Sequence, residues 1–334
     1  MMDFFFILMQ NSIMKKVHTL QYIFLILIIT SCVTIDSPIT STPKIKPTVE
    51  TKFDINTSNI TPSSINFQKL TDLRLATKYL FLYDDWYVRH QPIILQGLLN
   101  GTKSFTGDEI KLLEKANEDK NNLIKQLSTI SDSIQNEKIV SALKIWRISL
   151  DSHGIDQSKL ESGVSLTDLS QATGLNANMD LYGALFEYSE PLYTQQSQTF
   201  DQLSDLRNAY KFLHLDQEIF AKAISLDIFI IMSQGIENIS ESEIDKINLF
   251  LSFEEEKKLN SDNVLLEIKN QNIVNSLSIW RSFRNGENID FSKFENDILE
   301  GFNLNDLSEM NTATPADYQL NLYGLMYKYS ESNE

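Results

Sequence analysis

A twelve-residue stretch that occurs twice constrains the fold more than any other feature of this 334-residue chain. Residues 136–147 read NEKIVSALKIWR and residues 270–281 read NQNIVNSLSIWR, so that seven of the twelve positions are identical. In the first copy, Ile139, Leu143 and Trp146 follow one another at spacings of four and three residues. This spacing places them on one face of a helix that packs against other helices. The duplication therefore predicts two similar helical modules.

The match between the two halves extends well beyond this stretch. Three further motifs recur, namely LTDLR at 70–74 and LSDLR at 203–207, LYG at 181–183 and 322–324, and YSE at 188–190 and 329–331. The expected helices are 68–99, 109–127, a third over 136–150 and 179–193 in the first half, and 200–233, 243–259 and a third over 270–284 in the second. No alternating stretch is long enough to predict a sheet. We therefore predict an all-α protein of two tandem four-helix-bundle-like repeats, residues 67–196 and 197–334, stacked end to end or side by side.

Helix boundaries carry matching signals in the two halves. A hydroxyl followed three residues later by a glutamate is a capping box, and a glycine after a helix favours a C-cap. Proline disturbs a helix interior, so we expect a kink at Pro92 and a bend at Pro191 as one repeat runs into the next. The capping boxes are Thr106–Glu109 and Ser240–Glu243, and the C-cap glycines are Gly101 and Gly235.

The N-terminus is typical of an exported protein. Residues 1–31 contain Lys15 and Lys16 followed by the apolar run LQYIFLILII, which is the pattern of a secretory signal peptide. The end of this run, Ile-Thr-Ser-Cys, resembles the lipobox of bacterial lipoproteins, in which the thiol of the cysteine, here Cys32, receives diacylglycerol. The alternative, a transmembrane anchor, is disfavoured because the apolar run is shorter than the roughly 20 residues that a span needs. Either Met1 or Met14 could be the start.

The stretch after the lipobox predicts a tether. Residues 32–66 are rich in Ser, Thr, Pro and Asn and show no helical or strand period. Such a stretch buries too little apolar surface to offset its ordering entropy. The whole chain carries a formal net charge of −16, which argues against nucleic acid or anionic lipid as a partner.

No motif indicates catalysis, a cofactor or a metal. The histidines His18, His90, His153 and His214 are never paired at helical spacing, and neither HExxH, ExxH, GxSxG, GxGxxG nor a Walker loop occurs. Cys32 is the only cysteine, so no intramolecular disulfide can form. Acidic runs such as Asp84–Asp85 and Glu254–Glu256 are interpreted as solvated faces, because adjacent carboxylates on a helix do not face each other. We predict that the protein is not an enzyme and has no cofactor.

Cations at equivalent points of both halves are the candidate binding residues. Arg and Lys lie four residues apart on each first helix, and an arginine follows each repeated tryptophan. One interpretation is that these cations pair with acidic residues of neighbouring helices. The other is a small-anion site, because the arginine fork binds an oxyanion in a bidentate manner. The residues concerned are Arg74, Lys78, Arg147, Arg207, Lys211 and Arg281.

The second half resembles the nitrate- and nitrite-sensing domain of bacterial receptors. The shared order of features is Leu206, Lys211, Gln217–Glu218, the glycine at 235, the SESE of 240–243 and the FLSF of 250–253. The resemblance implies tandem helical bundles outside the membrane that hold the anion with arginines. The chain departs from the family at its Glu-Arg pair on the first helix, which reads Asp85–Trp86 here and Glu218–Ile219 in the second half.

Two functional hypotheses follow. The first is a membrane-anchored, extracytoplasmic lipoprotein that acts as a non-enzymatic binding or interaction module of the bacterial cell envelope, with an envelope protein as its partner. The second is a module that senses or binds a small oxyanion such as nitrate or nitrite. Val33 rather than aspartate follows Cys32, which favours the outer membrane where the organism has one and otherwise the cell membrane.

Overall fold

The computed structural model describes residues 61–100, 105–151, 174–192, 197–235, 238–284 and 315–331. Every regular element among them is an α-helix, so the protein is all-α as predicted. The first repeat supplies α2 (Pro62–Asn100), α3 (Gly107–Ser133), α4 (Glu137–Asp151) and α6 (Gly174–Tyr188). The second supplies α7 (Gln198–Ser225), α8 (Ile228–Ser233), α9 (Glu241–Glu267), α10 (Gln271–Arg284) and α12 (Pro315–Tyr329). The expected signal peptide, Cys32 and residues 33–60 of the expected tether lie outside the described residues. The tether was expected to end at residue 66, but residues 62–66 form the start of α2.

Both predicted capping boxes begin their helices. At the start of α3, Glu109 N–H donates to Thr106 Oγ1 (3.3 Å), and Thr106 N–H donates to the Glu109 carboxylate (2.7 Å). At the start of α9, the Ser240 hydroxyl donates to Glu243 at 2.6 Å and its N–H donates to the same carboxylate at 2.8 Å. These hydrogen bonds lower the pKa of the Glu243 carboxyl. Gly235 follows α8 with φ +83°, a left-handed conformation that favours glycine and confirms the predicted C-cap. Gly101 lies outside the described residues.

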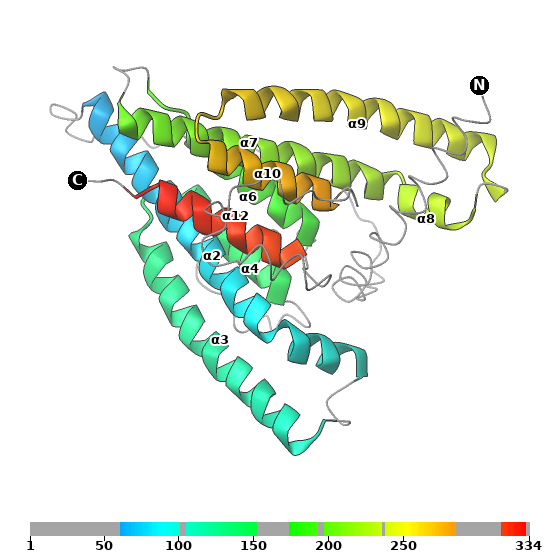
Figure 1. Cartoon of the computed structure of the whole chain (residues 1–334), viewed down its shortest axis with the longest axis horizontal. Coiled ribbons are helices and arrows are strands. Elements are labelled where there is room, and N and C mark those ends of the chain that lie inside the picture. Colours follow the sequence, from blue (N-terminus) through cyan, green and yellow to red (C-terminus); the bar gives the residue numbers. More distant parts are fainter. Residues whose placement is uncertain are drawn as a thin grey trace, which may run out of the picture.

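The first helices of the two repeats differ at their far ends. α2 includes Pro92 within one 39-residue helix, and Figure 1 shows it changing direction in its C-terminal part. In the second repeat the expected single helix over 200–233 is wrong. α7 ends at Ser225, the counterpart of Pro92, and α8 begins after Asp227, whose φ of 55° is left-handed. An aspartate tolerates this conformation better than most residues, so it replaces a proline kink with a break.

One hydrophobic core joins the two repeats. The repeated tryptophans Trp146 and Trp280 are both buried in it, as the helical spacing predicts. The same cluster contains Leu73 from the first repeat and Leu206 from the second. The repeats are therefore parts of one folded unit rather than bundles with separate cores.

The helices reach this common core by exchange between repeats. α2, the first helix of repeat one, packs most extensively against α12, the last helix of repeat two, and α7 packs in the same way against α6 (Figure 1). Within each repeat, α3 packs on α2, α9 on α7, α4 on α6 and α10 on α12. This arrangement differs from the predicted stacking of two closed bundles, because each last helix crosses to the other repeat.

Contacts between counterpart residues identify a pseudo-two-fold axis. The hydroxyls of Thr77 and Tyr210, which occupy equivalent positions of the two first helices, lie 2.6 Å apart. The hydroxyls of Tyr182 and Tyr323, equivalent positions of the two last helices, also contact each other. A residue meets its own counterpart only near the axis that relates them, as at an isologous dimer interface. The chain is thus folded like a dimer made of one polypeptide.

The repeated LYG motif allows each last helix to approach the first helix of the other repeat. A Cβ added at Gly183 in α6 would lie 3.2 Å from the His214 ring of α7. A Cβ added at Gly324 in α12 would lie 3.2 Å from the Phe81 ring of α2, which is the counterpart position. A larger residue at either position would therefore press on the facing ring. After Tyr188 the chain leaves the helix, so the expected continuous run through Pro191 is wrong.

Candidate functional site

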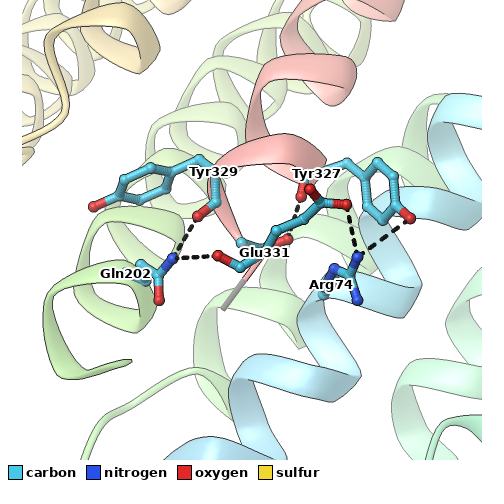
Figure 2. A network of polar contacts seen from close by, with 6 residues as sticks. Arg74, Gln202, Tyr327, Tyr329 and Glu331 are labelled. Atoms are coloured by element: carbon cyan, nitrogen blue, oxygen red, sulfur yellow. Dashed lines mark hydrogen bonds and ion pairs between the residues drawn. The ribbon is translucent and has the colours of Figure 1, made fainter. Parts of the chain in front are cut away.

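Arg74 of α2 meets the C-terminal end of α12. Its Nη2 lies 2.8 Å from Glu331 Oε1 and 3.5 Å from the Tyr327 hydroxyl, as Figure 2 shows. The guanidinium carbon also lies 5.0 Å from the centroid of the Tyr327 ring, within cation–π range. Lys78 Nζ approaches the same ring at 5.7 Å. The two cations of the first helix are thus held against one aromatic ring of the other repeat.

Arg207 of α7 repeats this arrangement with the end of α6. Its Nη2 lies 2.8 Å from Glu190 Oε2, and its guanidinium carbon lies 4.3 Å from the centroid of the Phe186 ring. Lys211 Nζ approaches the Phe186 ring at 5.7 Å. Like charges at i and i+4 repel each other on an isolated helix. Here an aromatic ring and a carboxylate from the opposite repeat offset that repulsion in both halves.

The two glutamates also tie the first helices to each other. The backbone carbonyl of Glu331 accepts a hydrogen bond from Gln202 of α7 (3.2 Å), while its side chain pairs with Arg74 of α2 (Figure 2). The backbone carbonyl of Glu190 accepts from Lys69 of α2 (2.6 Å), while its side chain pairs with α7. Each last helix therefore ends between both first helices. We call this set, Arg74, Arg207, Glu190 and Glu331 with the rings of Tyr327 and Phe186, the junction.

Beside the junction, one buried aspartate in each repeat stabilises the start of the third helix of that repeat. Asp205 accepts the backbone N–H of Lys269 (2.8 Å) and of Asn270 (3.0 Å), and the hydroxyl of Tyr329 (2.8 Å). Its counterpart Asp72 accepts one backbone N–H, from Gln135 at 3.1 Å, and two hydrogen bonds from side chains. A carboxylate that accepts several hydrogen bonds tolerates burial. The side-chain donors to Asp72 are Gln68 Nε2 (2.9 Å) and the Tyr188 hydroxyl (2.7 Å).

Burial and these hydrogen bonds change the pKa of Tyr188 and Tyr329, the two tyrosines that donate to the aspartates. Desolvation and the hydrogen bond to Asp72 raise the pKa of Tyr188. Desolvation and the hydrogen bond to Asp205 raise the pKa of Tyr329 in the same way. Both phenols are therefore donors at neutral pH, as the two carboxylates require.

The arginines that follow the repeated tryptophans lie in different surroundings. Arg281 Nη1 is 2.7 Å from the Asp262 carboxylate and 3.2 Å from Ser261 Oγ, with its guanidinium 5.1 Å from the Phe212 centroid. Its counterpart Arg147 is buried in the first repeat. Three of the four predicted arginines, Arg74, Arg207 and Arg281, thus have a carboxylate of the chain itself within 2.8 Å.

Asp84 contradicts the interpretation of the acidic pairs as solvated faces. It is 6 % exposed on α2, and its Oδ2 has no hydrogen-bond partner among the described residues. Desolvation raises the pKa of its carboxyl well above the usual value. Asp85 behaves differently, because it pairs with Arg89 at 2.7 Å. The counterpart of Asp84 in the second repeat is the neutral Gln217, also buried, which fits a protonated Asp84.

The remaining histidines of the described helices serve packing contacts. His90 Nε2 of α2 lies 3.0 Å from the Asp119 carboxylate of α3. His214 Nδ1 donates to the Met179 carbonyl at 2.9 Å. Across the described ranges, no group of three His, Cys, Asp or Glu residues is placed to hold a metal ion. In the same ranges no helix is long and apolar enough to cross a membrane.

Sequence reasoning singled out the cations of the junction but not their partners. Glu190 and Glu331 close the repeated YSE motif, and Asp72 and Asp205 lie inside the repeated LTDLR and LSDLR motifs. Their recurrence was therefore visible, and the missing information was that last helices cross between repeats. Compared with protein-family models, curated proteins and solved structures, the chain gives no match.

Proposed function

We propose that this protein is a lipid-anchored, extracytoplasmic lipoprotein of the bacterial cell envelope, held through Cys32, whose helical part is a non-enzymatic interaction module. The Ile-Thr-Ser-Cys lipobox and the Ser-, Thr- and Pro-rich residues 33–61, which precede α2, support the anchor and the tether. Val33 after Cys32 favours the outer membrane where the organism has one, and otherwise the cell membrane.

The main support for an interaction module is that the recurring arginines form ion pairs within the fold. Arg74 and Arg207 pair with carboxylates of the opposite repeat, each at 2.8 Å. Cations paired in this way already have a charge partner within the chain, which supports a role in packing over a role in ligand binding. The chain therefore acts through its outer surfaces, as a protein-binding scaffold or accessory subunit does.

One observation favours the alternative of a small-oxyanion site. The Nε atoms of Arg74 and Arg207 are buried and have no hydrogen-bond partner within the described part of the chain. Buried donors of this kind are costly and can be satisfied by an anion. Lys78 and Lys211 lie on the same helix faces, and Arg147 and Arg281 are the further candidates.

The anchor is tested by metabolic labelling of cells with an alkyne analogue of palmitate. We expect the full chain to carry the label and to fractionate with membranes. The Cys32→Ser variant should lose the label, whereas Ser31→Ala, which keeps a small residue in the lipobox, should retain it. Labelling that persists in Cys32→Ser would rule out lipidation at this residue.

The small-oxyanion site is tested by thermal unfolding of the full chain with millimolar nitrate, nitrite, sulfate or phosphate. An anion that binds only the folded state stabilises it by about 2.7 kcal/mol at a hundredfold excess over its Kd. A selective rise in Tm with one anion that is lost in Arg207→Ala would favour the sensor over the scaffold. The absence of any shift would remove these anions as ligands.

A further inference from the structure

The outward face of α9 exposes leucines that its counterpart α3 does not have. Leu251, Leu259 and Leu266 of α9 are 41 %, 63 % and 85 % exposed. The helices correspond residue by residue at an offset of 134, because both capping boxes and the buried positions of their inner faces align. At the positions of these three leucines, α3 carries the exposed residues Asn117, Lys125 and Asp132.

The comparison shows that the fold does not need these leucines. α3 and α9 occupy equivalent places, each packed on the first helix of its repeat. At these three sites the outer face of α3 carries polar residues, whereas α9 exposes apolar side chains to water. Single exposed leucines are ordinary on protein surfaces, but a row of them along one helix indicates an interaction site.

Four of the five exposed large apolar residues of α9 form a stripe, and the fifth, Leu249, lies outside it. Ile244, Leu251, Leu259 and Leu266 are separated by seven, eight and seven residues. At 100° per residue they fall within about 80° of one another around the helix axis. Figure 1 shows α9 along the edge of the molecule, with α7 on its inner side. We call these four residues the α9 stripe.

The charge around the α9 stripe selects among possible occupants. Exposed carboxylates lie among and beside its residues, and exposed lysine is scarce on this helix. A second copy docking through the same face would place carboxylates against carboxylates, and an anionic membrane would be repelled in the same way. A partner with lysine or arginine beside its own apolar residues is attracted instead. The carboxylates concerned are Asp245, Glu255, Glu256 and Glu267.

We propose that the α9 stripe is the docking surface for a basic amphipathic helix of a partner protein. This proposal rests on the proposed function, which it deepens by giving the partner's chemistry. Spacings of seven and eight residues match the apolar row of a second helix that packs lengthwise on α9, with side chains interdigitating. The contact can extend along all 27 residues of α9, about 40 Å at 1.5 Å per residue.

The experiment uses the full-length lipidated protein in nanodiscs of zwitterionic lipid and two fluorescent 25-residue peptides. Both peptides carry leucines at the α9 spacing, flanked by lysines in one and by glutamates in the other. Empty nanodiscs give the background. We expect the basic peptide to bind with a higher affinity than the acidic peptide. Its affinity should fall when salt is added.

Variants that exchange residues between α9 and α3 supply matched controls. The triple change Leu251→Asn, Leu259→Lys, Leu266→Asp gives α9 the residues of α3 without altering net charge, and should weaken peptide binding about ten-fold or more. Leu112→Lys gives α3 the residue found at position 246 of α9, and should leave binding unchanged. The triple variant should keep its Tm within a few degrees, because the replaced side chains are exposed.

Several results would overturn the proposal. These are no binding of the basic peptide, equal binding by the triple variant, equal binding of the acidic peptide, or unfolding of the triple variant. Light scattering that finds a wild-type dimer and a monomeric triple variant would assign the stripe to a second copy instead. The peptide experiment uses protein that has already been shown to carry the Cys32 label, so a failure of peptide binding is separable from a failure of the anchor.

Discussion

The two halves of the junction are close copies, whereas one buried position of the two first helices is not. Arg74 with Glu331 and Arg207 with Glu190 have the same 2.8 Å geometry and the same aromatic neighbour position. Further along α2, by contrast, the buried carboxyl of Asp84 stands where α7 has an amide. The contacts of the junction are alike in both halves, whereas Asp84 and Gln217 are buried counterparts that differ. The difference gives α2 a buried ionisable group at a position where α7 has a neutral one.

The largest expected effect comes from the buried aspartates that cap the third helices. Asp205→Ala leaves two backbone N–H groups and the Tyr329 hydroxyl without an acceptor, and should lower the free energy of unfolding by about 3–5 kcal/mol. Asp72→Ala leaves only one backbone N–H without an acceptor. It should therefore lower the free energy of unfolding by about 1–3 kcal/mol less than Asp205→Ala does. Urea unfolding followed by circular dichroism measures both. The exposed Asp108→Ala is the control, and equal losses at 72 and 205 would break the comparison.

The next largest effect is expected at Asp84, the buried carboxyl whose counterpart in α7 is the amide of Gln217. Desolvation raises the folded pKa of Asp84 above its unfolded value, so the native state binds more protons in the window between the two values. Stability contributed by the neutral form is therefore full below the unfolded pKa, about 3.9, and is lost as pH rises towards the folded pKa. Asp84→Asn should remove this loss and raise the free energy of unfolding at pH 7 by about 1–3 kcal/mol.

The counterpart position provides the reverse experiment. Gln217→Glu introduces a buried carboxyl into α7, so the variant should lose stability as pH rises above about 4.3, which wild-type protein does not do at this site. Urea unfolding at a series of pH values between 3 and 9 checks both variants. An Asp84→Asn curve parallel to wild type at every pH would show that Asp84 is ionised in the folded protein.

Sequence periodicity sufficed for the helices because their determinants are local. The capping boxes at Thr106 and Ser240 and the apolar spacing around Trp146 act within one or two turns, so they predicted where the helices form. The break at Asp227 was missed because the sequence there remains apolar and carries no proline. Only the comparison with Pro92 shows that both first helices need a change of direction at this point.

The exchange of last helices could not be derived from local patterns. A closed bundle and an exchanged pair bury the same apolar stripes, and they differ only in which repeat supplies the neighbour. The junction cations were identified because they recur, but their partners depend on that neighbour. Asp84 was misassigned for a related reason, since α2 packs against α12, a helix more than 200 residues away in the sequence.

The glycines of the LYG motif should give a smaller, asymmetric effect. Alanine at either site gains about 1 kcal/mol of helix propensity but presses on an aromatic or imidazole ring. His214 is fixed by its hydrogen bond to the Met179 carbonyl, so Gly183→Ala should be destabilising by about 1 kcal/mol. The Phe81 ring has no such restraint, and Gly324→Ala should lie near zero. Thermal unfolding distinguishes them, and a greater loss at Gly324 would contradict this reasoning.

The smallest effect is expected at the ion pairs of the junction themselves. Arg207 is 20 % exposed and Arg74 is 37 % exposed, while their glutamate partners are half-exposed or more, so solvent screens both pairs. Double-mutant cycles with Arg→Met and Glu→Gln should give coupling energies of about 0.2–1 kcal/mol, with the 207–190 pair at the upper end because its arginine is more buried. Both couplings should shrink in 1 M salt. A coupling well above this range at either pair, insensitive to salt, would mean that the junction orders the crossing of the repeats through charge rather than through its rings and backbone hydrogen bonds.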